Sequence, residues 1–322
     1  LAAQNTMAAS YGKMTKTQKQ FLEKQLAVYD GIKDTKTTIS TSPAKNYTVK
    51  DAAIFLGILA GVDTKDTVTI ESKGKALKDY TIGFNKNYLA GKRIGIEASF
   101  FKGNNEDVIA LYRSTIEILK KQGAIIIEVE LMKEINEAVG NTEFDILKFE
   151  FKDGVNKYLS TANATVKTLE EVIAFNNNNQ ATAMPYFKQE TLISSNKKDS
   201  LESTEYKNAL VQSLKSRAII SNMLKENKLA AICSVTNGLA ACIDTVNGDY
   251  DTGFSFSTPA AISGYPHITV PMGFIHELPI GFSFMADAYQ EAEIINLAYA
   301  FEQATLQRKK PKFLTTAIPK VN

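Results

Sequence analysis

The sequence predicts an α/β fold with a mixed β-sheet flanked by helices, and three observations carry this prediction. Residues 92–130 pass from a strand through a helix to a second strand, which is typical of a parallel βαβ unit. Residues 267–274 and 280–285 have the composition of two strands joined by a short turn, which indicates a hairpin. A helix with apolar residues at helical spacing follows over residues 290–307.

The βαβ unit is predicted from residue types that suit each of its elements. Residues 92–96 are predicted as a short strand, and residues 124–130 are rich in β-branched side chains, which favour strands. The helix between them is predicted over residues 106–122, and Gly123 ends it because glycine tolerates the left-handed backbone that follows many helices. We expect both strands to lie inside a sheet that helices cover on both faces. A further buried strand is predicted over residues 230–235.

A helix near the start of the chain is predicted from the residues at its ends. Thr48 and Asp51 have the spacing of a capping box, and Gly61 ends the helix. Apolar residues lie almost all round this helix, so we expect it to be buried. Before it, residues 15–29 place apolar side chains on one helical face, and residues 34–47 have the composition of a loop.

Residues 141–227 are predicted to be mostly helical. One helix covers residues 144–159, a second begins with a capping box at Thr168, and a third covers residues 203–226. The aromatic side chains of the first helix share helical spacing, and we expect them to pack in the core: Phe144, Phe149, Phe151 and Tyr158.

Charge and hydropathy exclude two classes of protein. The 37 basic and 35 acidic residues give a formal net charge of +2, so we expect no nucleic-acid partner. No run of about 18 apolar residues occurs, so we expect no membrane-spanning helix. The chain begins with Leu1 in place of methionine, which predicts a processed or trimmed start. The compartment stays open, with the cytoplasm favoured.

The positions of cysteine, histidine and carboxylate residues predict no cofactor and no metal. Cys233 and Cys242 are expected to be buried free thiols, with a single disulfide as the alternative. His267 and His276 have no neighbouring cysteines or carboxylate pairs, so we expect structural or surface roles. One polar loop is predicted to be an Asx-rich turn, with a Ca²⁺ site as the alternative: Asp244, Asn247, Asp249 and Asp251.

Three motifs near the C-terminal end resemble the amidase signature family in order and spacing. They are STPAAISGYPHITVPMG at residues 257–273, LPIGFSF at 278–284 and AYAFEQA at 298–304. The resemblance extends upstream with less specific motifs and covers about residues 46–313, the second part of the family domain. It divides the chain into a divergent N-terminal segment, residues 1–47, and one amidase-signature-like α/β domain, residues 48–322.

The resemblance implies amide chemistry through a Ser-Ser-Lys triad in which a desolvated lysine activates serine. In the family these residues precede the helix that begins here at Thr48. Only 47 residues precede it, and their candidate hydroxyls, Ser40 and Ser42, lie in a stretch without glycine. The segment from Ser194 to Lys197 also combines serines with lysine, but we expect an exposed loop there. No catalytic residue is therefore assigned.

Two departures from the family pattern bear on substrate binding. The family often has Ala-Pro-Thr where residues 233–236 are Cys-Ser-Val-Thr. It usually has a glycine-bearing turn near the substrate pocket where residues 285–287 are Met-Ala-Asp. The family scaffold is thus better preserved than its site.

These observations predict an amidase homologue that lacks amide hydrolysis on its own and acts as a binding or scaffold protein, a pseudoenzyme. The first alternative is the C-terminal portion of an active amidase whose catalytic half is absent from this chain. The second is a divergent hydrolase with an unidentified serine. We expect a small amide-like ligand, and a homodimer or an N-terminal complementing segment that covers an exposed apolar face and an unpaired sheet edge.

Overall fold

The structure, a computed structural model, describes residues 48–248 and 250–310. The chain divides into two units, and the described residues up to Arg308 all belong to the second of them, whose fold is given below. The helix predicted over residues 15–29 and the loop over 34–47 lie outside the described residues. The domain boundary predicted between residues 47 and 48 stays a prediction.

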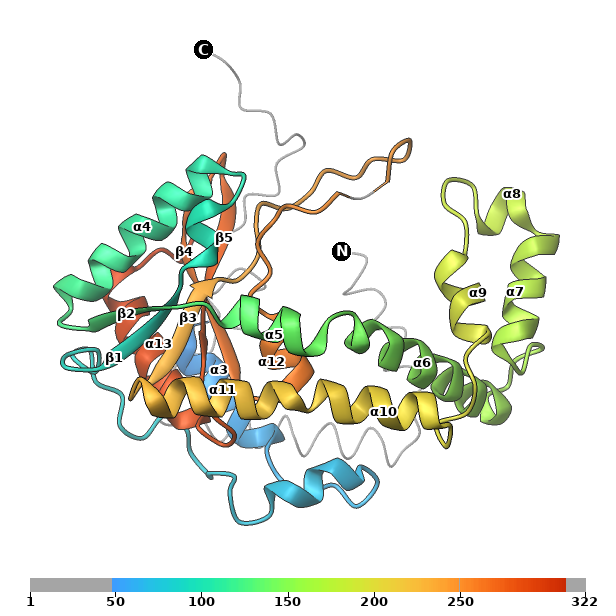
Figure 1. The fold of residues 1–322 in the computed structure, drawn as a ribbon, viewed down its shortest axis with the longest axis horizontal. Helices are drawn as coiled ribbons and strands as arrows, with labels where there is room; N and C mark the ends of the chain where they lie inside the picture. The colour runs from blue at the N-terminus through green and yellow to red at the C-terminus, as the bar shows by residue number, and fades with distance from the viewer. Residues whose placement is uncertain (1–47, 249, 311–322) are drawn as a thin grey trace. The chain divides into compact units, whose positions relative to one another are not determined.

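A mixed sheet forms the core of the described fold and lies on the left in Figure 1. Its five strands run in the order β2-β1-β3-β5-β4. Strand β1 pairs in parallel with β2 and β3, and β5 pairs antiparallel with β3 and β4. The predicted α/β class is confirmed. The strands are β1 (Arg93–Glu97), β2 (Ile125–Val129), β3 (Ala231–Val235), β4 (His267–Ile275) and β5 (Leu278–Met285).

The βαβ unit predicted over residues 92–130 is present as β1, α4 (Glu106–Lys121) and β2. The side chain of Asn105 accepts the backbone N–H of Val108 and so begins α4. The expectation that both strands lie inside the sheet is correct for β1 and wrong for β2. In the described residues β2 pairs on one side alone, which leaves Ile125 46% exposed.

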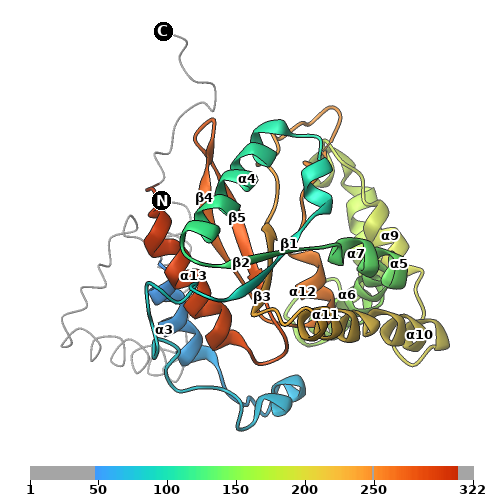
Figure 2. The same cartoon turned by 60° about the vertical axis from the view of Figure 1, so that its left-hand side comes forward.

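The hairpin of β4 and β5 contributes two of the largest fully buried side chains of the core, Phe282 and Phe284. His276 and Glu277 turn the chain with φ of 49° and 66°, the left-handed conformation that two-residue hairpin turns favour. Phe282 and Phe284 of β5 are fully buried against Phe301 of α13 (Glu291–Thr305), with ring centroids 5.3 and 5.8 Å from it. In Figure 2, α13 and α4 lie together on one side of the sheet, and α11 and α12 lie on the other.

Helix α3 (Val49–Leu59) begins with the predicted capping box of Thr48 and Asp51. A carboxylate oxygen of Glu302 in α13 accepts the Val49 backbone N–H at 2.9 Å, which ties the start of α3 to the core. The expectation that α3 is buried is wrong, since Phe55 is 60% exposed. The helix packs on α13 along one face, so the apolar residues of its other face stay open.

Residues 141–227 are mostly helical, as predicted, and a further helix precedes them at residues 131–139. The helix expected over residues 203–226 is interrupted at Leu214. We call α6 to α10, with their connections, the helical arm. The helices are α5 (Leu131–Val139), α6 (Thr142–Thr161), α7 (Leu169–Asn178), α8 (Gln180–Ala183), α9 (Glu190–Asn196), α10 (Thr204–Ser213) and α11 (Lys215–Glu226). The remaining short helices are η1 (Thr67–Ser72), η2 (Ser99–Lys102) and α12 (Thr258–Ser263).

The aromatic residues of α6 depart from their predicted burial. Phe149 is fully buried, whereas Phe144, Phe151 and Tyr158 are exposed. Helical spacing identified the helix correctly, but α6 packs against α10, α9 and α7 without enclosing all of its apolar residues.

In the described residues, no helix is long and apolar enough to cross a membrane. Both cysteines are free thiols, and the expectation of burial is correct for Cys233 and wrong for Cys242.

Candidate functional site

Four polar side chains form a hydrogen-bonded row across β3, β5 and β4, and we call them the polar row. Thr236 directly follows β3, and its Oγ1 lies 2.6 Å from Thr269 Oγ1 of β4 and 2.7 Å from Ser283 Oγ of β5. Ser283 Oγ in turn lies 2.7 Å from Nε2 of His267, the first residue of β4. The row therefore links hydroxyls from three neighbouring strands to one imidazole.

Strand register brings the polar row together. Thr269 is paired with Ser283, and the Thr236 backbone N–H donates to the Gly281 carbonyl at 2.8 Å, so these side chains lie on one face of the sheet. Gly281 leaves the space that the two threonines occupy. A Cβ at this position would lie 2.5 Å from Thr269 Oγ1 and 2.7 Å from Thr236 Oγ1, too close for a stable contact.

The polar row leads from the surface into the interior. Thr269 is exposed, Thr236 is half-buried and Ser283 is fully buried. Burial lowers the pKa of His267, so its imidazole is neutral at pH 7 and can accept a hydrogen bond from the serine. A serine beside a neutral imidazole has the arrangement of a nucleophile and its base.

Two features limit this pair as a catalytic centre. In residues 48–248 and 250–310, no carboxylate hydrogen-bonds to His267 to orient its ring. Ser283 has no exposed surface from which to attack a substrate. The outer part of the row, Thr269 and Thr236, offers donors and acceptors to a polar ligand, and the geometry therefore supports binding more directly than hydrolysis.

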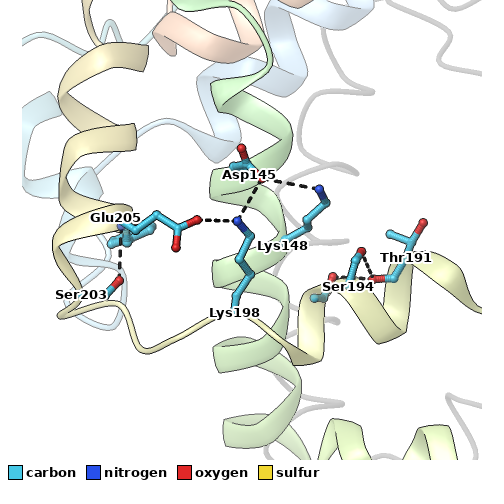
Figure 3. Close-up of polar contacts among 9 residues, drawn as sticks. Asp145, Lys148, Thr191, Ser194, Lys198, Ser203 and Glu205 are labelled. Atoms are coloured by element: carbon cyan, nitrogen blue, oxygen red, sulfur yellow. Dashed lines mark hydrogen bonds and ion pairs between the residues drawn. The ribbon is translucent and has the colours of Figure 1, made fainter.

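The serine and lysine segment at residues 194–197 differs from its prediction (Figure 3). It ends helix α9 and is not an exposed loop, and Ser195 is buried. Ser194 and Ser195 donate to the Thr191 carbonyl at 3.0 and 2.8 Å, so both hydroxyls complete the helix. Lys197 is exposed, so this segment contains no desolvated lysine next to its serines.

The neighbouring Lys198 is also unsuited to act as a base. Its ammonium lies 2.6 Å from Glu205 Oε1 and 3.1 Å from Asp145 Oδ1, as the dashed lines in Figure 3 show. The hydrogen bond to Glu205 is the main cause that raises the pKa of Lys198, so the side chain stays protonated. This cluster fastens α10 to α6 and is structural.

A family model described as Amidase matches residues 29–295. The chain belongs to the amidase family. This confirms the resemblance carried by the C-terminal motifs, which form α12, the β4–β5 hairpin and α13.

Similar proteins agree with this assignment. A probable amidase of Arabidopsis thaliana is 31% identical over 277 residues, which cover 83% of this chain and 49% of the relative. The peptide amidase PAM, solved with the competitive inhibitor chymostatin, superimposes with a TM-score of 0.73 and 34% identity over 83% of this chain and 54% of its own. An amidase family protein from Bacillus anthracis superimposes with a TM-score of 0.68 and 30% identity over 83% of this chain and 48% of its own. The chain spans about half the length of these relatives.

The two departures from the amidase family pattern lie in different places. Thr236, which ends the segment at residues 233–236, belongs to the polar row. Ala286 is buried, and Asp287 accepts the Ser221 hydroxyl at 2.8 Å. Both line a groove of about 610 Å³ beside α11 and the start of α13. Residues 286 and 287 thus border a cavity, and the hydrogen bond from Ser221 ties them to α11.

The polar loop takes the turn structure predicted for it. Asp244 accepts the backbone N–H groups of Val246 and Asn247, which lowers the pKa of its carboxyl group. These bonds define an Asx turn. Asp249 lies outside the described residues. The described residues contain no group of three or more side chains suited to hold a metal ion.

The sequence assigned no catalytic, cofactor or metal residue, and it missed the polar row. His267 and His276 were correctly placed at the start of a strand and in the hairpin turn. The available signal was the alternation of His267 and Thr269 on one face of a strand. To place Ser283 beside these two residues, the register between the two predicted strands must also be known.

Proposed function

We propose that this chain forms the substrate-binding part of an amide (C–N) hydrolase and does not hydrolyse amides by itself. The polar row is the observation that carries this proposal. It supplies hydroxyls that can bind an amide, while its serine is buried and its imidazole lacks a carboxylate partner within the described residues. Lys198, the lysine next to the segment at residues 194–197, is ion-paired with Asp145 and Glu205, so it does not supply the neutral lysine that amidase chemistry requires.

The proposed substrate is the carboxamide of a peptide. Support comes from the similarity to a peptide amidase, which covers 83% of this chain at 34% identity. The matched relatives are about twice as long as the matching region. We therefore propose that the Ser-Ser-Lys residues come from polypeptide outside residues 1–322. The homodimer or complementing segment predicted from the sequence stays a proposal, and the exposed apolar residues of α3 are the surface available for it.

A second candidate is a divergent hydrolase that uses Ser283 as nucleophile and His267 as base. The 2.7 Å contact between Ser283 Oγ and His267 Nε2 favours it. Burial of Ser283 opposes it, because a substrate would have to open the sheet face to reach the hydroxyl.

A fluorophosphonate probe separates the two candidates, because it labels only activated serines. Residues 1–322 are incubated with the probe, with Ser283→Ala as the test variant and Ser194→Ala as the matched control. We expect neither labelling nor release of ammonia from a peptide amide. Stoichiometric labelling that Ser283→Ala abolishes and Ser194→Ala leaves intact would establish the second candidate and overturn the first.

A further inference from the structure

Helix α6 carries a line of apolar side chains that its neighbours in the helical arm leave open. Each of the four is between 44% and 72% exposed: Phe144, Leu147, Phe151 and Tyr158. Together with Gly154 they follow steps of three and four residues, which is the spacing of the a and d positions of a coiled-coil heptad. We call these five residues the α6 stripe. Large apolar side chains grouped on one surface mark an interaction site.

The α6 stripe lies on the side of the helix that faces away from the rest of the arm. Asp145 of α6 pairs with Lys198 (Figure 3). Phe149 lies 5.5 Å from a tyrosine ring of α10, and Asn156 accepts a backbone N–H of α7 at 2.8 Å. At 3.6 residues per turn, these contacting residues are about 150° from the stripe around the helix axis. The stripe is therefore accessible to a partner that lies along α6.

Two copies of the α6 stripe have complementary shapes when the helices run antiparallel. In such a pair each a position faces a d position, and large side chains insert between those of the facing helix. Phe151 opposite Gly154 of the second copy brings Leu147 opposite Tyr158, and two-fold symmetry repeats both pairs. A Cβ built at Gly154 would have no heavy atom within 4 Å, so the glycine leaves room for the phenylalanine ring. A parallel pair would place glycine against glycine and leave that room empty.

The residues beside the stripe are complementary in the same register. Glu150 and Lys157 flank it on one side, and both are exposed. The antiparallel register places Glu150 of each copy near Lys157 of the other, which gives two ion pairs per dimer. Each of these side chains has one partner at 2.7 Å in its own chain, and a carboxylate or an ammonium can bind more than one. On the other flank Lys148 lies opposite Val155, so no like charges meet there.

We propose that the α6 stripe is the interface of a homodimer in which two α6 helices pack antiparallel, with Phe151 of each copy over Gly154 of the other. The occupant is a second copy of this chain, because the stripe supplies both members of each pair, large with small and acidic with basic. This interface is separate from the exposed face of α3 and independent of the proposed function. Part of each ring is already buried in the arm, so the dimer covers only about 1,000 Å² in total, which is typical of transient complexes.

Sedimentation equilibrium of residues 1–322, from about 1 to about 300 µM, tests the interface. We expect a monomer–dimer equilibrium with a Kd on the order of 10 µM. Phe151→Ser should weaken it at least about ten-fold, because the change is made twice in a symmetric dimer. Phe55→Ser is the matched control, since Phe55 is 60% exposed on α3, and it should leave the Kd unchanged. Circular dichroism confirms that both variants fold.

A charge exchange tests the antiparallel register. Glu150→Lys and Lys157→Glu should each weaken the dimer about five-fold, because each turns two ion pairs into two like-charged pairs. The double variant should restore most of the affinity, since the pairs form again with their signs exchanged. A loss that came only from the partners of these side chains in their own chain would not be restored. In a parallel pair the two residues lie on different turns, and the exchange has no such pattern.

Four results contradict the inference. A monomer over the whole concentration range excludes the interface. A dimer that survives Phe151→Ser uses another surface, and a dimer that Phe151→Ser and Phe55→Ser weaken equally has no specific interface at α6. A dimer that depends on Phe151 but is not restored by the double charge exchange excludes the antiparallel register. None of these results changes the serine labelling or the ammonia release that test the proposed function.

Discussion

The β4–β5 hairpin with α13 and the helical arm both contain clustered aromatic residues, but they use them differently. In the hairpin region, Phe282, Phe284 and Phe301 are fully buried and contact one another. In α6 of the arm, Phe149 is buried while Phe144 and its exposed neighbours face outward. The hairpin is therefore stabilised by apolar burial, and the arm keeps apolar surface available.

The arm, whose aromatic residues are less buried, also has polar contacts between its helices. Lys198 bridges Asp145 and Glu205, and its ammonium also lies 4.9 Å from the ring centroid of Phe149. Partly exposed ion pairs of this kind contribute about 0–1 kcal/mol each. The hairpin region therefore depends on buried rings, whereas the arm depends in part on ion pairs that are partly exposed to solvent.

The largest expected effect is the loss of a core ring. Phe282→Ala should lower the free energy of unfolding by about 3–5 kcal/mol, because the cavity left between Phe284 and Phe301 cannot close fully. Phe144→Ala in the arm should lower it by only about 1 kcal/mol, since half of that ring is already exposed and its main loss is the contact with Lys148. Urea unfolding followed by circular dichroism measures both. Equal losses would show that the contrast between the regions is false.

A glycine-to-alanine change should have opposite signs in the two regions. Gly281→Ala places a Cβ against the threonine hydroxyls of the polar row and should cost about 1–3 kcal/mol. Gly154→Ala, inside α6 with no heavy atom within 4 Å of the new Cβ, should stabilise by up to about 1 kcal/mol. The melting temperatures of the two variants test this prediction. If Gly281→Ala stabilised the protein, the hydroxyls of the polar row would have to move apart to accept the new methyl group.

The hairpin region was also the more predictable of the two. This region has two runs of β-branched residues, a short turn and a helix with periodic apolar residues. These patterns predict both the secondary structure and the buried face, and the strands and the core residues were therefore predicted correctly. For α3 and α6 the apolar periodicity identified each helix, but periodicity does not say whether a neighbour covers the apolar face. Phe55 and Phe144 were therefore placed in the core although both are exposed.

The candidate site could be predicted only in part. The motifs around His267 and Ser283 led to the correct family, because family membership depends on local sequence. The contacts of Thr236 with Thr269 and Ser283 depend on register across three strands and on the absence of a side chain at Gly281. Neither condition can be read from composition or spacing. Gly248 approaches Phe187 so closely that a Cβ built on the glycine would lie 4.0 Å from the ring, and these residues are 61 positions apart with no local sequence signal that links them.

The smallest expected effect is a difference in the pH at which each region loses stability. Burial lowers the pKa of His267 below its ordinary value of 6.5, so below pH 6.5 the unfolded chain binds a proton that the folded chain does not. The free energy of unfolding should therefore fall as the pH drops from 6.5 towards the lowered pKa. His267→Gln should remove this dependence.

In the arm, the hydrogen bond from Lys198 lowers the pKa of Asp145 below 3.8. Its contribution is present above pH 3.8 and is lost as the pH falls through the lowered value, with a loss below about 1 kcal/mol because the carboxylate is partly exposed. Hydrogen exchange measured at pH 7, 5 and 3 separates the two windows. Hairpin amides should lose protection first, between pH 7 and 5, and α6 amides only near pH 3. If the α6 amides lost protection first, the ion pairs, and not the neutral imidazole of His267, would determine the pH at which the protein begins to lose stability.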